Sequence, residues 1–250
     1  MAVWQDLDDE LDAWAGANRT AAFWWRDDDL EASSDGLDAL LALRRGLAIP
    51  VALAAIPATA QPALSGLLRA ESDTVILQHG YDHANRAPPG AKKAEFAASR
   101  SQAQVVGQLI EGRTRLGRMF GDRFRPILVP PWNRIDAELV ALLPKAGFIG
   151  LSAFAGRRPE NPVQGLPRAD CHVDVIDWRG GRDFVGVEAA LDQALKALSD
   201  LRRMGSARAV GILTHHRVMD RPAWDFLAAL AGRVVAKGTG RWIAVDQALC

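Results

Sequence analysis

The feature that most constrains the fold is an alternation of short apolar runs with longer segments of helical periodicity. Apolar runs of strand length occupy residues 20–26, 50–56, 74–78, 126–129, 148–151, 172–176, 209–213 and 242–245. Apolar residues recur at helical spacing in residues 3–15, 35–47, 62–69, 92–120, 135–146, 187–203 and 222–236. Repeated strand–helix units predict an α/β fold with a mainly parallel sheet covered by helices.

The length of the chain limits which α/β architectures are possible. Seven or eight strands in 250 residues fit a closed or nearly closed (β/α) barrel, formed as a single domain of residues 1–250. An open, doubly wound sheet is the main alternative. No shift in composition marks a linker, and residues 1–18 are expected to form a leading helix before the first strand.

Charge and hydropathy exclude several classes of partner. The chain has 30 Lys and Arg residues against 30 Asp and Glu residues and no basic cluster, so we expect neither nucleic acid nor an anionic membrane surface as a partner. No apolar run approaches the roughly 20 residues needed to cross a bilayer, and residues 1–6 do not resemble a signal peptide. Two cysteines, Cys171 and Cys250, form a poor disulfide framework. A cytoplasmic location is expected.

Three consecutive carboxylates follow the first predicted strand. Asp27, Asp28 and Asp29 come directly after Arg26. At the end of a buried strand, adjacent carboxylates need cations to offset their mutual repulsion, and Arg26 or a divalent metal ion would supply the charge. The alternative is an acidic loop that caps the next helix.

Two histidines follow the third predicted strand, in the segment His79-Gly80-Tyr81-Asp82-His83. Two imidazoles four residues apart can converge on one metal ion from a turn. Together with a carboxylate they form a set that suits zinc and leaves positions open for water and substrate. The alternative is two unrelated loop histidines.

The turn after residues 126–129 is stiffened by Pro130 and Pro131. A rigid backbone N–H at Trp132 would suit an oxyanion donor. The alternative, which is compatible with the first, is a strand-to-helix turn in which Asn133 caps the helix expected near Ile135.

Two later strand ends carry further polar groups. Asp174 and Asp177 precede Trp178, where an aspartate could orient a charged neighbour and the indole could wall a pocket. His215 and His216 follow the strand at 209–213, where a histidine could protonate a leaving group. The alternatives are ordinary strand-end polarity and a solvated histidine pair.

These five segments, in this order, resemble the motifs of the polysaccharide deacetylase family, also called the NodB-homology family or carbohydrate esterase family 4. The similarity spans about residues 20–220. It rests on the aspartates after Arg26, the pair His79 and His83, and three shorter stretches: Val129-Pro130-Pro131-Trp132, the Asp-x-x-Asp-Trp pattern at 174–178, and Leu213-Thr214-His215.

The resemblance implies a distorted (β/α) barrel of about seven strands that holds a divalent metal ion, usually zinc. It implies a hydrolase of amide bonds that removes an acetyl group from an N-acylated carbohydrate or related small molecule. Asp28, His79 and His83 would bind the metal ion. Asp27, Trp132, His215, Asp177 and Arg26 would be catalytic. A substrate pocket would include Trp178, Tyr81, Asn133, Asp174 and His216.

The chain departs from the family pattern at several positions. Gly80 replaces a Ser or Thr that supports the histidine loop, and Trp132 replaces Tyr. Asp29 replaces a glycine, which leaves the register of base and metal ligand open by one residue. His216 could likewise take the part of His215. Two other functions stay open: hydrolysis of a different C–N bond, such as a cyclic amide, and non-catalytic carbohydrate binding on the same scaffold.

Overall fold

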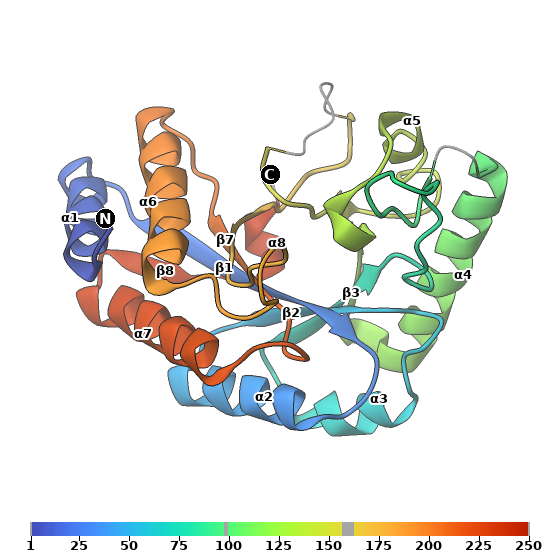
Figure 1. The fold of residues 1–250 in the computed structure, drawn as a ribbon, viewed down its shortest axis with the longest axis horizontal. Helices are drawn as coiled ribbons and strands as arrows, with labels where there is room; N and C mark the ends of the chain where they lie inside the picture. Colours follow the sequence, from blue (N-terminus) through green and yellow to red (C-terminus); the bar gives the residue numbers. More distant parts are fainter. Residues whose placement is uncertain (1, 98–99, 157–162, 250) are drawn as a thin grey trace. The chain divides into compact units, whose positions relative to one another are not determined.

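The computed structural model describes residues 2–97, 100–156 and 163–249, shown as a ribbon in Figure 1. These residues form two compact units, which are described separately. Unit 1 comprises residues up to Asp27, Ser34–Val51 and Cys171–Ala248, and unit 2 comprises Asp28–Ser33 and Ala52–Asp170 together with Leu249. The expectation of a single domain stays a prediction.

The sheet of unit 1 is built around strand β1 (Ala21–Leu30), which gives its first seven residues to this unit. Strand β7 (Val210–Thr214) pairs in parallel with β1, and β6 (Cys171–Asp174) pairs in parallel with β7. A short strand, β8 (Gly240–Trp242), also pairs in parallel with β1. The register places Asp27 of β1 opposite Thr214, the last residue of β7.

Five helices belong to unit 1: α1 (Trp4–Gly16), α2 (Asp35–Leu47), α6 (Val187–Arg203), α7 (Arg221–Lys237) and α8 (Val245–Ala248). Helix α1 packs against α6, α2 against α7, and α6 against β6. Helix α7 has clear sequence signals at both ends. The Asp220 side chain accepts a hydrogen bond from the Ala223 amide, and Gly238 ends the helix in a left-handed conformation.

Unit 2 contains β2 (Val51–Ala55) except for its first residue, together with β3 (Thr74–His79), β4 (Phe124–Val129) and β5 (Gly150–Leu151). They are neighbours in that order, and the pairs β3–β4 and β4–β5 are parallel. The last three residues of β1 belong to this unit, and the Leu30 carbonyl accepts a hydrogen bond from the Ile56 amide just beyond β2. The sheet therefore presents the ends of β1, β3 and β4, where the predicted site residues lie.

The longest helix of unit 2, α4 (Gln102–Phe120), packs on β3 and β4. Its buried residues Val105, Leu109, Leu116 and Phe120 recur at the spacing of one helical face. The remaining helical segments are α3 (Ala63–Leu67), η1 (Leu68–Ala70), η2 (Gly121–Arg123), η3 (Pro131–Asn133) and α5 (Ala137–Val140).

The predicted fold class is confirmed: parallel strands alternate with helices, and seven strands follow the order β5-β4-β3-β2-β1-β7-β6 expected of the distorted (β/α) barrel type. Several predicted boundaries were wrong, including those of β1, α5 and β8. Strand β1 continues to Leu30, so the three aspartates lie within it. Helix α5 stops at Val140, four residues before Pro144, and β8 stops at Trp242, after which residues 245–248 form α8.

The helix expected over residues 92–120 begins only at Gln102, and residues 98–99 lie outside the described residues. The segment before it is held by bonds that a helix would not allow. The Ala94 amide donates to the Asn85 side chain, and the Ala94 carbonyl accepts from the Arg86 amide. Tertiary hydrogen bonds thus override a helical pattern in this stretch.

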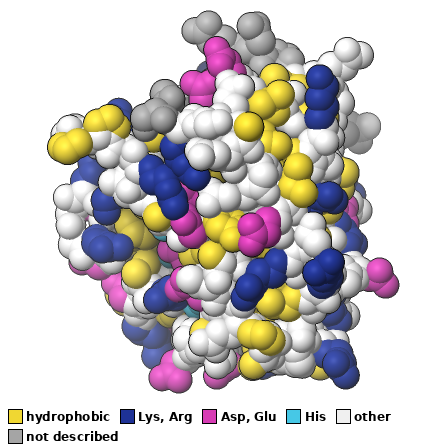
Figure 2. Space-filling view, turned by 90° about the vertical axis from the view of Figure 1, so that its right-hand side faces the viewer, with side chains coloured by type: hydrophobic (Ala, Val, Ile, Leu, Met, Phe, Trp, Pro, Cys, Tyr) yellow, Lys and Arg dark blue, Asp and Glu magenta, His cyan; other side chains and the backbone are white. Residues whose placement is uncertain are grey.

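The outer surface shows no single sign of charge. Figure 2 shows acidic and basic side chains interspersed over one face, without a continuous basic area. Among the described residues, no helix is long and apolar enough to cross a membrane. Cys171 is buried and is not part of a disulfide, whereas Cys250 lies outside the described residues.

Candidate metal centre

Three side chains of unit 2 converge at the ends of β1 and β3. One ligand atom from each of Asp29, His79 and His83 lies within 4.8 Å of the other two. Asp29 Oδ1 is 3.2 Å from His79 Nε2 and 3.5 Å from His83 Nε2. His79 is almost fully buried, and the other two side chains are about one quarter exposed. Two imidazole nitrogens and a carboxylate oxygen form a donor set that fits a divalent metal ion such as zinc.

The His79 ring is oriented by a backbone carbonyl. Its Nδ1 lies 3.0 Å from the Val129 carbonyl oxygen at the end of β4. A carbonyl can only accept, so Nδ1 must carry the hydrogen in this contact, and in the neutral ring Nε2 keeps its lone pair. This Nε2 atom, which lies 3.2 Å from Asp29 Oδ1, is therefore available to bind a metal ion. This is the usual way in which a second contact fixes the tautomer of a histidine ligand.

The surroundings of His83 favour the neutral form of its imidazole. Burial lowers the pKa of His83, and the charge of His79 acts in the same direction, while Asp29 and Asp28 oppose them. A lowered pKa keeps the imidazole unprotonated near neutral pH, which is the form that binds a metal ion.

The backbone between the two histidines is tied down by one carboxylate. Glu95 accepts hydrogen bonds from the amides of Tyr81 at 2.9 Å, Asp82 at 3.3 Å and His83 at 3.2 Å. Glu95 is fully buried, and this burial raises the pKa of its carboxyl above the ordinary value. Sequence reasoning missed Glu95, because it lies 12 residues beyond His83 in a stretch with helical periodicity.

Left-handed backbone conformations gather around the three ligands. Positive φ angles occur at Asp29 (69°), His83 (54°), Trp132 (54°) and Asn133 (55°). Such angles are uncommon for residues other than glycine and tend to cluster where a site dictates the side-chain direction. The ring of Trp132 lies 4.4 Å from that of His83, centroid to centroid, so the turn after β4 forms one wall beside the ligand.

The turn after β4 differs in one respect from the expectation. The cap of the following helix is Asp136, whose side chain accepts from the Glu138 amide, so the assignment of Asn133 as the cap was wrong. Asn133 instead lies in η3 and donates its amide to the Pro130 carbonyl. The oxyanion role of the Trp132 amide stays a prediction.

In unit 1, Asp27 of β1 forms a closed hydrogen-bond network with residues of and just after β7. Its Oδ2 accepts from the Thr214 hydroxyl at 2.6 Å and from the His216 amide at 2.9 Å. Its Oδ1 lies 2.5 Å from His216 Nδ1. The Thr214 hydroxyl in turn accepts from the Trp25 indole N–H at 2.8 Å. Asp27 is fully buried, and both of its oxygens serve this network.

The Asp-x-x-Asp-Trp segment organises its own loop. Asp174 Oδ2 accepts from the Trp178 indole N–H at 2.9 Å, and the Trp178 ring meets the His215 ring edge-on, with centroids 4.6 Å apart. Asp177 Oδ1 accepts from the amides of Arg179 and Gly180, so it closes a tight turn. Asp174 therefore orients the Trp178 indole, which packs edge-on against the His215 ring.

The remaining predicted site residues are placed as follows. Arg26 is fully buried within β1 and lies opposite Leu213 of β7. The Tyr81 hydroxyl donates to Glu111 of α4 at 2.7 Å, and this bond raises the pKa of Tyr81. Asp28 is nearly fully buried beside Asp29. The structure thus groups Asp29, rather than Asp28, with the two histidines. The catalytic roles of all these residues stay predictions.

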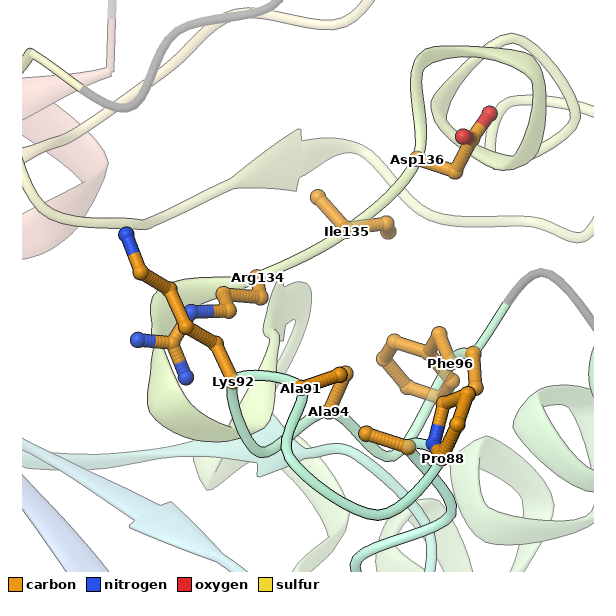
Figure 3. A pocket seen from close by; sticks show the side chains of 10 residues that line it. Pro88, Ala91, Lys92, Ala94, Phe96, Arg134, Ile135 and Asp136 are labelled. Carbon is orange, nitrogen blue, oxygen red and sulfur yellow. The ribbon is translucent and has the colours of Figure 1, made fainter.

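A pocket of about 310 Å³ is formed in unit 2 by two segments that directly follow the site. Residues 87–97 come after His83, and residues 134–136 come after Trp132. Figure 3 shows the Lys92 amine and the Arg134 guanidinium together at one end, the Phe96 ring toward the other end, and the Asp136 carboxylate turned away. An apolar wall with a few polar groups is typical of small-molecule sites.

Comparison with solved structures identifies the class of fold. A proposed polysaccharide deacetylase from Mycobacterium smegmatis superposes with a TM-score of 0.67 at 18% identity, covering 91% of this chain and 88% of its own. The Bc1960 peptidoglycan N-acetylglucosamine deacetylase gives 0.60 at 16% identity, covering 93% and 94%. A family 4 acetyl xylan esterase from Clostridium thermocellum, solved with a cobalt ion, gives 0.59 at 10% identity, covering 91% and 89%.

The chain therefore has the fold of the polysaccharide deacetylases and family 4 carbohydrate esterases over more than nine tenths of its length. The resemblance inferred from five short motifs is confirmed at the level of the fold. No protein-family model matches the sequence, and the search of curated proteins finds no match. The likeness therefore rests on the fold and on the five short motifs.

Proposed function

We propose that this protein is a metal-dependent hydrolase that removes an acyl group from an N-acylated sugar or a related small molecule. The observation that carries the proposal is the convergence of Asp29, His79 and His83, with the His79 tautomer fixed by the Val129 carbonyl. The fold supports it, since its solved neighbours include deacetylases and esterases.

Asp29, His79 and His83 would hold the metal ion, most readily zinc. One acid and two neutral imidazoles leave at least one position open for water or substrate, as catalytic rather than structural zinc sites do. When bound, the ion would polarise the acyl carbonyl and lower the pKa of a water molecule. The neighbour that contains cobalt supports a divalent ion and leaves its identity in the cell to be measured.

The choice of metal ligand decides which of the neighbouring aspartates can act as the general base. With Asp29 as ligand, the adjacent Asp28 is the candidate general base. Its carboxylate lies close enough to influence the charge state of His83. Asp27 is a poorer base, because both of its oxygens already accept hydrogen bonds in a fully buried network. Asp28 would take a proton from the attacking water as the new C–O bond forms.

Two further roles complete the reaction. The Trp132 amide, held by the turn after Pro130 and Pro131, would donate to the oxyanion as the carbonyl becomes tetrahedral. His215 would give a proton to the nitrogen as the C–N bond breaks, so that a carboxylate and a free amine leave. The contact between His215 and Trp178 supports a fixed ring orientation for this step. The catalytic parts expected from the sequence for Arg26, Asp177 and His216 stay predictions.

The substrate would place its reacting acyl group at the metal centre and its remainder against neighbouring surfaces. The pocket between residues 87–97 and 134–136 is the candidate for that remainder in unit 2. Tyr81, Asn133, Asp174 and Trp178 are the further candidates predicted from sequence.

Metal content and acyl release test the proposal together. Purified protein loaded with zinc is expected to retain about one ion per chain and to release acetate from N-acetylated sugars. His79→Ala should lose both properties. His172→Asn is the matched control, because His172 is not one of the three converging side chains and its Nδ1 accepts a hydrogen bond from the Gly211 amide that asparagine can keep. Absence of bound metal in the unaltered protein overturns the proposal, and release of product only from cyclic amides redirects it to that other class.

A further inference from the structure

Glu95 is a fully buried carboxylate that the proposed reaction does not use. It lies in the segment between the histidine loop and α4, and its partners are three consecutive backbone amides of that loop. Oε1 accepts from Tyr81 and Asp82, and Oε2 accepts from His83. A charge placed in a protein interior requires such partners, so the contact is a built feature of the unit.

The loop is shaped to admit this carboxylate. Gly80 has a φ of 57°, and a Cβ added there would lie 2.1 Å from Glu95 Oε2 and 2.6 Å from Cγ of Pro131. Both distances are far below van der Waals contact. Glycine at position 80 is thus needed for its conformation and for the space that Glu95 and Pro131 occupy.

We propose that Glu95 is a positioning residue of the metal centre: it holds the backbone of residues 81–83 so that the His83 imidazole faces Asp29 and His79. Glu95 would thereby take the supporting part that a Ser or Thr at position 80 plays in the pattern this chain resembles. The inference rests on the proposed metal site, and it adds the reason why this site tolerates Gly80.

The geometry of the three bonds explains why His83 is the residue most affected. Its φ of 54° lies in the left-handed region, which a residue with a side chain rarely adopts unaided. The bond from the His83 amide to Oε2 fixes the backbone at that residue, and the Trp132 ring packs against the imidazole. Without the backbone bond, the ring would lose its fixed approach to Asp29.

Glu95→Gln is the sharpest test. The side chain keeps its size, but one oxygen becomes an NH₂ group, so at least one of the three amides faces a second donor. Zinc affinity, measured by competition with a chromophoric chelator, is expected to fall about 10- to 100-fold, as for other groups that orient metal ligands. In the metal-free protein, the amides of residues 81–83 should lose protection from hydrogen exchange.

Glu111→Gln is the matched control. Glu111 also contacts this loop, but through the Tyr81 hydroxyl rather than the backbone. The Glu111→Gln variant should bind zinc as tightly as the unaltered protein and should show the same protection of the loop amides from hydrogen exchange. If Glu95→Gln binds zinc as tightly as Glu111→Gln does, the inference is overturned while the proposed function stands. If the unaltered protein binds no zinc, the proposed function fails, and amide protection alone then decides whether Glu95 holds the loop.

Discussion

Replacing Asp29 by asparagine tests which aspartate binds the metal ion. Asparagine has the same shape and tolerates the left-handed backbone that Asp29 adopts at a φ of 69°, so the strand end should keep its path. What is lost is the only charged atom of the three that converge, Asp29 Oδ1. The parallel variant Asp28→Asn removes the neighbouring charge and leaves the three converging atoms in place.

The expected loss of stability can be calculated because zinc binds the folded protein and so shifts the folding equilibrium. Zinc at about 1,000 times its dissociation constant stabilises the folded protein by about 4 kcal/mol. Loss of a direct ligand should weaken binding at least as much as loss of an orienting group, so by about 100-fold. The same zinc concentration is then about 10 times the dissociation constant and stabilises by about 1.4 kcal/mol. The difference, about 2.7 kcal/mol, corresponds to roughly 5–11 °C in the midpoint of thermal unfolding for a chain of this size.

The assay is thermal unfolding with and without zinc, together with a zinc titration of each variant. Asp29→Asn should lose most of the zinc-dependent rise in midpoint, and Asp28→Asn should keep nearly all of it while losing acyl release. The reverse pattern, in which Asp28→Asn loses zinc and Asp29→Asn retains it, would refute the grouping of Asp29 with the histidines.

Three further outcomes are expected. Asp27→Asn should lower the free energy of unfolding by about 2–4 kcal/mol, because it disturbs a fully buried charged hydrogen-bond network, and zinc titration should show unchanged affinity. Gly80→Ala should abolish zinc binding, since its Cβ would meet Glu95 and Pro131. The control Gly46→Ala, whose Cβ would have nothing within 4 Å, should raise the unfolding free energy by about 0.5–1 kcal/mol in urea titrations. His215→Ala should lower kcat by about 100- to 10,000-fold with zinc content unchanged, and a kcat within twofold of the original would remove His215 from the mechanism.

The sequence predicted the elements well where the apolar periodicity agrees with the residues that begin and end a helix or strand. Helices α2 and α6 begin and end where expected, because each has a clear apolar face. Prediction failed where tertiary contacts decide the local structure. The segment before α4 has helical periodicity, yet bonds between Asn85, Arg86 and Ala94 hold it in another form.

At the site, the sequence identified the two histidines and the acidic run but left the register of the run open. Strand periodicity could not resolve it, because Asp29 has a left-handed backbone and the simple alternation of side chains ends there. Glu95 and the Val129 carbonyl could not be found at all. One is distant in sequence, and the other is a backbone group that carries no residue signature.

The fit of Gly80 against Glu95 has a consequence for how such a loop can change over generations. A serine introduced at position 80 would strike the carboxylate, while loss of Glu95 alone would leave the loop amides without their acceptor. Either single replacement passes through a weakened loop, so the two ways of supporting it are separated by an unfavourable intermediate. Among descendants of this chain, glycine at 80 and glutamate at 95 should therefore be inherited together or replaced together.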